Sequence, residues 1–308
     1  MSVAEAQPFP EVPFDSSKFR YRGDGSVPDK SQYDSRGERG VYLADKHLVN
    51  AVNTAIIVGQ PLLVVGESGT GKTMLAWSIA SELGLLPVLE FHTRSDHHAR
   101  DVLFVIDNLR RFYHAQIKDK RADDLTEYIR YAALGEAIRS GGKRVVLIDE
   151  IDKATRDFPN DLLDEIDQMQ FEVPDTGEKF KSAEKPIVVI TSNSERQLPD
   201  PFLRRCVFHQ IAFPKPEDLV RILGQRLEPG VDSALIDAAV AQFGRLRAEA
   251  LKLQKKPSTG ELIVWLRMLV HAGVDPAKLA AAPLAGLPFK GALIKNDNDL
   301  GRVQRATS

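Results

Sequence analysis

Residues 66–73 read GESGTGKT, which places Gly, Lys and Thr at the fixed positions of the pattern GxxxxGK[ST]. Glycine lets a loop adopt left-handed dihedrals and turn its backbone N–H groups toward an anion. A lysine there can contact two phosphate groups, and the hydroxyl beside it can bind Mg²⁺. This spacing therefore predicts that the chain binds a nucleotide through its phosphates. The residues expected to make the contact are Gly66, Glu67, Ser68, Gly69, Thr70, Gly71, Lys72 and Thr73.

Two carboxylates follow a later apolar run, because VVLIDE ends in Asp149 and Glu150. Ligands of open α/β sheets lie at the carboxyl ends of strands, so both side chains should face the phosphates. We expect Asp149 to hold Mg²⁺ with Thr73, and Glu150 to polarise the water that attacks the terminal phosphate. An acidic pair after a strand can also be a helix cap, but the upstream phosphate loop favours the chemical interpretation.

Asn193 ends the next apolar run, ITSN, where its amide could contact both the water and the terminal phosphate. A turn-forming Asn is the alternative interpretation. Arg204 and Arg205 lie in PDPFLRRC, at the end of an expected short helix. An arginine that meets the transferring phosphoryl group stabilises the charge that grows in the transition state, whereas an exposed helix-end pair would only compensate the helix dipole.

These side chains need a sheet that presents them along one edge. Apolar runs predict strands at Leu62–Val65, Val88–Phe91, Val145–Asp149, Pro186–Asn193 and Cys206–Phe213. Helices are expected between the strands, at about 43–58, after the loop at 66–73, and at about 125–140 and 160–168. Continuous apolar runs that alternate with helices are typical of parallel strands covered on both faces. The predicted fold class is α/β, with a doubly wound parallel sheet.

The composition changes along the chain in a way that predicts three regions. Residues 1–40 are polar and proline-rich and should form an extended or partly disordered arm. Residues 41–214 should form the α/β nucleotide-binding domain, with an insertion at about 92–120 that is helical toward Gln116, and a hairpin at about 170–180. Residues 215–308 carry helical patterns only, at about 217–227, 233–250 and 259–272, and should form a small all-α domain.

The overall charge and the single cysteine limit the class of protein. The chain has 308 residues, with 41 Lys and Arg against 43 Asp and Glu, for a net charge of −2. Near neutrality argues against a nucleic-acid motor, because such proteins bind phosphates with clustered basic residues. Cys206 is the one cysteine, so an intramolecular disulfide is excluded and a reducing, cytoplasmic location is expected. No apolar run is long enough for a membrane span.

The order GESGTGKT, VVLIDE, TSN and PDPFLRRC, followed by helical segments, resembles an AAA+ P-loop ATPase. Within that superfamily, the insertion and the hairpin FEVPDTGEKF are typical of the branch that contains MoxR, dynein and midasin. The strings IDEIDKATRDFPNDLLDEID and ITSNSERQLPDPFLRRCVFH resemble bacterial MoxR-type ATPases. The resemblance covers roughly residues 41–300.

The resemblance implies an ATP- and Mg²⁺-dependent hydrolase that assembles as a homo-oligomeric ring, with six subunits expected. It assigns Asn193 the sensor 1 role and Arg205 that of an arginine finger, with Arg204 in reserve. The sequence departs from the family in sensor 2, because KKPSTGELIVWLR has no arginine near Ser258. Lys255, Lys256 and Arg267 are the candidate substitutes.

The expected function is remodelling or maturation of a protein client, and the resemblance implies a partner with a von Willebrand factor A domain. A nucleotide-dependent assembly switch in a bacterial signalling or defence system is the alternative.

Overall fold

The computed structural model describes residues 21–24, 42, 44–227 and 230–306. A sheet of five parallel strands lies at the centre, in the order β2-β5-β8-β1-β9. The strands are β1 Leu62–Gly66, β2 Leu89–His92, β5 Val145–Asp149, β8 Ile187–Ser192 and β9 Val207–Ile211. Every residue of β5 and β8 is buried, as expected for central strands. The sequence prediction of a parallel α/β sheet is confirmed, with strand bounds that match or differ by at most two residues.

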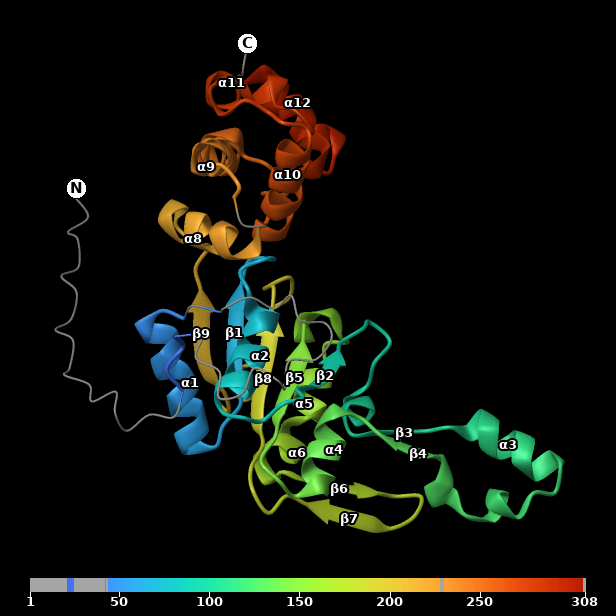
Figure 1. Cartoon of the computed structure of the whole chain (residues 1–308). Helices are drawn as coiled ribbons and strands as arrows, with labels where there is room; N and C mark the ends of the chain where they lie inside the picture. Colours follow the sequence, from blue (N-terminus) through green and yellow to red (C-terminus); the bar gives the residue numbers. More distant parts are fainter. Residues whose placement is uncertain (1–20, 25–41, 43, 228–229, 307–308) are drawn as a thin grey trace.

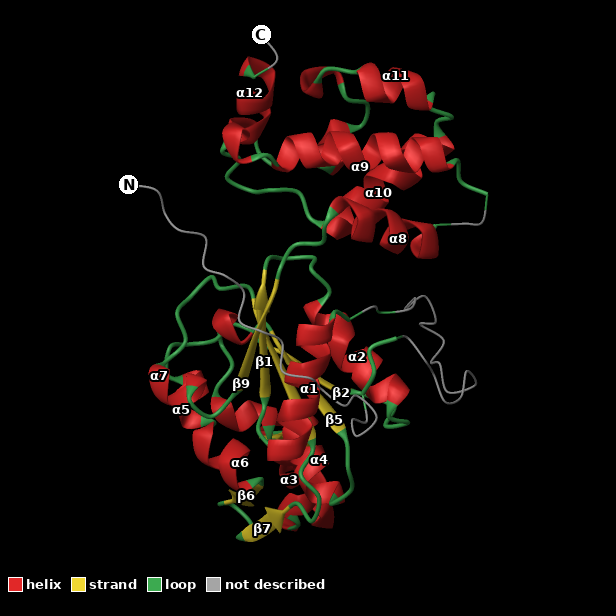
Figure 2. Ribbon diagram, turned by 90° about the vertical axis from the view of Figure 1, so that its left-hand side faces the viewer, coloured by secondary structure: helices red, strands yellow, loops and turns green. Residues whose placement is uncertain are grey.

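Helices cover both faces of this sheet (Figure 1 and Figure 2). Side chains alternate between the faces of a strand, so Val145 and Leu147 pack with the cluster that includes α1 and α2, whereas Val146 and Ile148 pack with the cluster that includes α4, α5 and α6. The helices of this region are α1 Lys46–Val58, α2 Lys72–Glu82, α4 Ala133–Ser140, α5 Phe158–Asp161, α6 Leu163–Gln168 and α7 Asp200–Leu203. The helix predicted at 160–168 is therefore two short helices, joined at Leu162.

An arm projects from the sheet between β2 and α4 (Figure 1). Its elements are η3 Ala99–Val102, β3 Phe104–Ile106, α3 Asn108–Gln116, η4 Lys120–Asp123, η5 Leu125–Tyr128 and β4 Ile129–Tyr131. Antiparallel pairing of Phe104 with Tyr131 and of Ile106 with Ile129 forms its base. The α-helix predicted from residue 125 begins only at Ala133, because residues 125–128 form the 3-10 helix η5 and residues 129–131 form β4, which pairs with β3.

Gly135 explains how α4 approaches the base of this arm. A Cβ placed on Gly135 would lie 1.9 Å from the carbonyl oxygen of Leu103, so only glycine allows this contact. The same carbonyl accepts a hydrogen bond from the N–H of Ala132 at 2.8 Å. The start of α4 is therefore fixed against the backbone of the arm.

The hairpin predicted at about 170–180 consists of β6 Gln170–Val173 and β7 Glu178–Lys181, which pair in antiparallel fashion. Gly177 has φ of 74° and closes the turn between them. The hairpin lies at the edge of the molecule opposite the C-terminal helices (Figure 1).

The C-terminal part is helical and has its own hydrophobic core, centred on Trp265, Phe243 and Leu266. Its elements are α8 Pro216–Arg226, α9 Ser233–Arg247, η7 Glu249–Leu251, α10 Thr259–His271, α11 Pro276–Ala281, η8 Leu284–Gly286, η9 Lys290–Ala292 and α12 Asp297–Arg305. The sequence interpretation missed α11 and α12, although Asp275 and Asn296 cap them with their side chains. We call residues 215–306 the lid. No helix in the described part of the chain is long and apolar enough to cross a membrane.

The N-terminal segment, residues 1–40, which the sequence predicts to be extended or partly disordered, lies outside the described residues apart from 21–24. In that short segment, Tyr21 is fully buried, and its backbone N–H donates to Oδ1 of Asn53 in α1 at 3.1 Å. Its hydroxyl lies 2.9 Å from Oγ of Ser78 in α2. Residues 21–24 are thus anchored on the face of the α/β region that α1 and α2 form.

Candidate active site

The phosphate loop connects the end of β1 to the start of α2. Gly69 and Gly71 have φ of 80° and 90°, a region that side chains disfavour. Gly71 is the N-cap of α2 and offers no side-chain acceptor, so the first N–H groups of this helix are available to an anion. The loop therefore has the backbone geometry that phosphate binding requires.

Lys72 is folded onto the loop itself. Its Nζ donates to the carbonyl oxygens of Gly66 at 2.9 Å and of Glu67 at 2.8 Å, and the residue is 6% exposed. Burial lowers the pKa of Lys72, and the carboxylates of Asp149 and Asp152 oppose that change. Both acceptors are carbonyl oxygens, so a phosphate oxygen that replaced them would add charge pairing to the hydrogen bond.

Asp149 joins α2 to the sheet. Thr73 Oγ1 lies 3.0 Å from Oδ1 and 3.2 Å from Oδ2 of Asp149, and Thr191 on β8 donates to Oδ1 at 2.6 Å. The hydroxyl and the carboxylate are hard oxygen donors of the kind that Mg²⁺ prefers. Within the described residues, no three His, Cys, Asp or Glu side chains gather as a metal site. A hydroxyl and one carboxylate nevertheless fit Mg²⁺ in a phosphate loop, where phosphate and water supply the other ligands.

Glu150 lies beside Asn193 at the ends of neighbouring strands. Asn193 Nδ2 donates to Oε1 of Glu150 at 2.9 Å, and Lys153 forms an ion pair with Oε2. Burial by itself would raise the pKa of Glu150, but the hydrogen bonds from Lys153 and Asn193 hold it below the usual value. Glu150 is therefore a carboxylate at neutral pH, as a group that polarises water must be.

The backbone of Glu150 is in a left-handed conformation, with φ of 56° and ψ of 52°. Non-glycine residues rarely adopt it, and such strain gathers at functional sites. The N–H of Glu150 donates to Oγ1 of Thr191 at 2.8 Å, which holds the strained residue in place. Sequence reasoning missed Thr191, although it stands in the same ITSN string as Asn193.

Asp152 fixes the backbone that carries Asn193. The carboxylate is buried, and its Oδ2 accepts the backbone N–H groups of Asn193 at 3.1 Å and of Glu195 at 2.9 Å. Ser194, between them, has φ of 61°. The last residue of DEID, which the sequence analysis did not single out, thus shapes the loop after β8.

The model of the family named ATPase family associated with various cellular activities (AAA) matches residues 62–215, which contain the loop and all five strands of the sheet. The chain belongs to the AAA family. It is therefore an ATP hydrolase. Among solved structures, the chain is similar to the crystal structure of the FIGL-1 AAA domain in complex with ADP, with 14% identity, a TM-score of 0.46, and coverage of 92% of this chain and 86% of that one. The search of curated proteins found no match.

In this AAA ATPase, the two candidate arginine fingers, Arg204 and Arg205, lie just beyond α7. Arg204 is exposed. Arg205 forms an ion pair through Nε with Oδ2 of Asp167 on α6, and its Nη1 donates to the carbonyl of Pro201 at 3.1 Å. The partners of Arg205 thus belong to α6 and α7, whereas the partners of Asn193 belong to the segment from Glu150 to Asp152. Tertiary structure brings together the loop, Asp149, Glu150 and Asn193, and it places Arg205 in a separate pair.

The lid of the AAA chain contacts the loop through an arginine that sequence reasoning missed. Arg247, at the end of α9, forms an ion pair with Glu67. The candidates from the sequence lie elsewhere, because Lys256 pairs with Glu249, Lys255 lies 4.0 Å from Glu261, and Arg267 is exposed on α10. Arg247 precedes the KKPSTGELIVWLR region by eight residues or more, so a search at that position could not find it.

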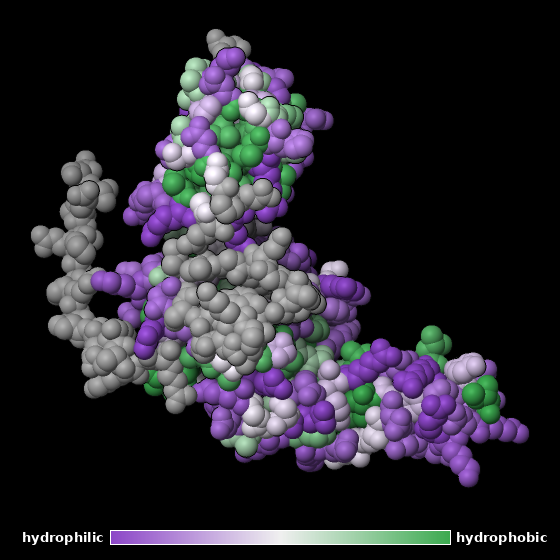
Figure 3. Space-filling view, viewed as in Figure 1, coloured by the Kyte–Doolittle hydropathy of each residue, from purple (hydrophilic) through white to green (hydrophobic). Residues whose placement is uncertain are grey.

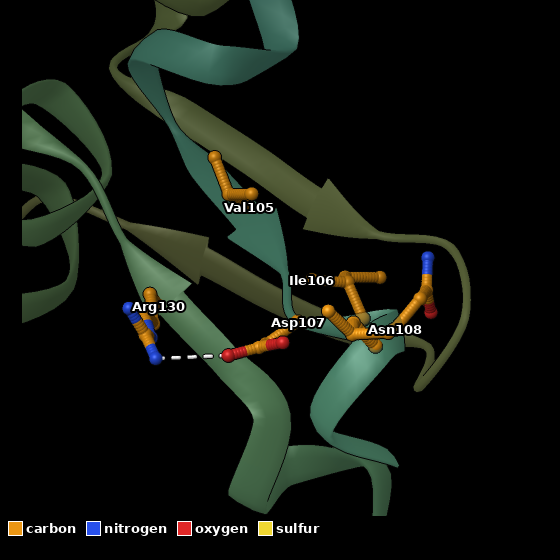
Figure 4. A pocket seen from close by; sticks show the side chains of 6 residues that line it. Val105, Ile106, Asp107, Asn108 and Arg130 are labelled. Carbon is orange, nitrogen blue, oxygen red and sulfur yellow. Dashed lines mark hydrogen bonds and ion pairs between the residues drawn. The ribbon is translucent and has the colours of Figure 1, made fainter. Parts of the chain in front are cut away.

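A separate pocket of the AAA chain lies on the projecting arm (Figure 4). Residues of β3 and α3 line it together with Arg130, which pairs with Asp107 at 2.8 Å. Leu109 lines this pocket and is 81% exposed, and Phe112 and Tyr113, also on α3, are 61% and 60% exposed. Figure 3 shows hydrophobic side chains among hydrophilic ones at the outer end of this arm. Phe112 and Tyr113 are therefore largely exposed in this chain, whereas Phe104 is buried.

Proposed function

We propose that the chain binds ATP with Mg²⁺ at residues 66–73 and hydrolyses it at the carboxyl ends of β5 and β8. The observation that supports this most is the hydrogen-bonded set that joins Thr73, Asp149, Glu150 and Asn193 across α2, β5 and β8. Loop amides, a lysine, a metal-binding pair and a water-orienting carboxylate are the parts that phosphoryl transfer requires, because its catalysis is mainly positioning and charge stabilisation.

Each side chain has a defined task in this proposal. Lys72 leaves the carbonyls of Gly66 and Glu67 and contacts the β- and γ-phosphates. Thr73 and Asp149 would hold Mg²⁺, and the ion would supply positive charge against the phosphates. Glu150 accepts a hydrogen bond from the attacking water, and Asn193 orients Glu150 while its amide faces the γ-phosphate.

The proposal includes assembly. AAA ATPases are usually oligomeric, and a ring of six subunits would place Arg205 of one subunit at the nucleotide of the next. Its pairing within α6 and α7 supports this, because nothing in that pair uses the loop of its own chain. We assign residues 41–214 to the nucleotide-binding domain and residues 215–308 to the lid domain, in keeping with their separate hydrophobic clusters.

We further propose that this is a MoxR-type ATPase of the cytoplasm, which remodels or matures a protein client, with a von Willebrand factor A domain protein as partner. The projecting arm between β2 and α4 and the β6–β7 hairpin, both of which the MoxR resemblance implies, support the subtype. The exposed Leu109, Phe112 and Tyr113 give that arm an apolar surface suited to a protein.

Glu150→Gln tests this function against the alternative of an assembly switch. Glutamine keeps the shape of the side chain and removes the base, so ATP binding should persist while hydrolysis falls by about 10²- to 10⁴-fold. A remodeller with this change should hold its von Willebrand partner in ATP and lose turnover of that complex. A switch should signal normally or stay locked on in ATP. Wild-type hydrolysis in Glu150→Gln would overturn the proposed mechanism.

A further inference from the structure

The lid and the phosphate loop touch within this single chain. Arg247 Nη2 donates to Oε2 of Glu67 at 2.5 Å, across 180 positions of sequence. A Cβ placed on Gly69 would lie 2.7 Å from Cβ of Ser258 and 3.2 Å from the backbone nitrogen of Thr259, at the start of α10. The loop proposed to hold phosphates is thus packed against both α9 and α10.

Arg247 is built into the base of the lid. Its side chain is 11% exposed, and its guanidinium carbon lies 3.4 Å from the centroid of the Phe213 ring, within the range of a cation–π contact. Nη1 donates to the carbonyl of Pro257 at 2.5 Å. Phe213 lies between β9 and α8, where the chain passes from sheet to lid, and Pro257 precedes α10. One guanidinium at the end of α9 therefore contacts the connecting segment, the residue before the cap of α10, and the loop.

Glu67 is contacted by two cationic side chains. Lys72 Nζ contacts its backbone carbonyl at 2.8 Å, and Arg247 contacts its carboxylate. A phosphate that draws Lys72 away removes the contact to the carbonyl and brings negative charge close to the carboxylate. Because like charges repel at short range, the arrival of phosphate changes the position that Glu67 prefers. That change reaches Arg247 directly.

We propose that Arg247 is a positioning residue that transmits occupancy of the phosphate loop to the lid through Glu67. This inference rests on the proposed binding of ATP at the loop. In this proposal the lid responds through a residue on α9, whereas Lys255 and Lys256 only form ion pairs within the lid. Phe213 converts a shift of Arg247 into a movement of the segment that connects sheet and lid, because the ring and the guanidinium are in contact.

Amide hydrogen exchange on the full chain tests the proposal, without nucleotide and with Mg²⁺ and a non-hydrolysable ATP analogue. In the wild type, the analogue should change exchange rates by about tenfold at the amides of Ala212, Phe213 and Lys215 and in α10, within the span of common allosteric couplings. Arg247→Gln should lose this change while calorimetry still detects bound analogue, and Glu67→Gln should lose it when measured at an analogue concentration that saturates that variant. The double variant should lose no more than either single variant, because both changes break one interaction.

Arg245→Gln is the matched control. Arg245 lies on the same end of α9, but its Nη1 donates to Oε1 of Gln242 at 2.9 Å and to the carbonyl of Ala282 at 3.4 Å, both in the lid. This variant should keep the full exchange response. Glu67→Gln separates charge pairing from folding defects, because it leaves the stacking of Arg247 on Phe213 intact.

The possible failures are distinguishable. A wild-type chain that binds no ATP analogue overturns the proposed function. Bound analogue with a wild-type exchange response in Arg247→Gln overturns only the role of Arg247. Loss of the response in Arg247→Gln with a full response in Glu67→Gln also overturns it, because packing on Phe213 would then explain the effect.

Discussion

Asn193 donates its side-chain amide to Oε1 of Glu150 at 2.9 Å, so the polar residue after β8 directly holds the carboxylate after β5. The backbone N–H of Asn193 in turn donates to Oδ2 of Asp152 at 3.1 Å. The carboxylate of Glu150, which is proposed to polarise water, is therefore oriented by a residue of the neighbouring strand.

Asn193→Ala should raise the pKa of Glu150, because one of the two hydrogen bonds that favour its ionised form is lost. The acidic limb of the pH–kcat profile should move to higher pH, and kcat at neutral pH should fall by about 10- to 100-fold. Steady-state ATPase assays across pH provide the measurement. Nucleotide affinity at neutral pH should change little, and an unshifted acidic limb would contradict the role of this hydrogen bond.

The free energy of unfolding of the wild type should fall as the solution is made acidic, because Glu150 becomes protonated. The pKa of Glu150 is lowered in the folded chain, so its contribution to folding is complete above the pKa of the unfolded state. That contribution is lost as pH falls through the lowered folded pKa. Denaturant unfolding of wild type and Glu150→Gln at a series of acidic pH values measures it, since the two free energies of unfolding should converge at low pH.

Asp152→Ala should lower kcat by about tenfold or more with little effect on the affinity for ATP, because it frees the loop that positions Asn193. Asp157, an exposed residue nearby without a side-chain cap bond, supplies the control, and Asp157→Ala should keep wild-type kcat. Equal values of kcat for the two variants would show that the hydrogen bonds to Asp152 do not position Asn193.

Lys72→Ala should abolish nucleotide binding, because the ammonium is the strongest positive group in the phosphate loop. Isothermal calorimetry with ATP and Mg²⁺ is the direct measurement. Removal of Mg²⁺ by a chelator should stop hydrolysis in the wild type, through the site formed by Thr73 and Asp149. Unchanged ATP affinity in Lys72→Ala would contradict the assignment of the loop.

Arg205→Ala should leave ATP binding largely intact and reduce hydrolysis by about 3 to 5 powers of ten if the arginine acts as a finger on the next subunit. Mixing this variant with Asp149→Ala should restore part of the activity, because mixed interfaces combine an intact loop with an intact finger. Failure of every mixture to recover activity would remove support for action between subunits.

Gly135→Ala should destabilise the fold by about 1–3 kcal/mol or more, because the added methyl group would overlap the backbone of the arm. The structural reason is the 1.9 Å separation between that Cβ and the carbonyl oxygen of Leu103. Gly142→Ala is the control, since a Cβ there meets nothing within 4 Å. Chemical denaturation of both variants gives the comparison, and equal midpoints would contradict the close approach of α4.

The sequence by itself determined the class of this protein, because the decisive features are local. GESGTGKT has fixed spacing, and the buried strands are continuous apolar runs whose polar ends mark one edge of a parallel sheet. Loop, Asp149, Glu150 and Asn193 could be named because each stands at the end of such a run.

Tertiary structure decided which of these groups meet and what supports them. Strand register places Thr191 on Asp149, and a buried Asp152 reaches the backbone beyond β8, which no spacing rule specifies. The strands β3 and β4 are too short to show periodicity, so only their pairing reveals them. Arg247 reaches Glu67 because the lid folds back over the loop, and a contact across 180 residues leaves no trace in local sequence.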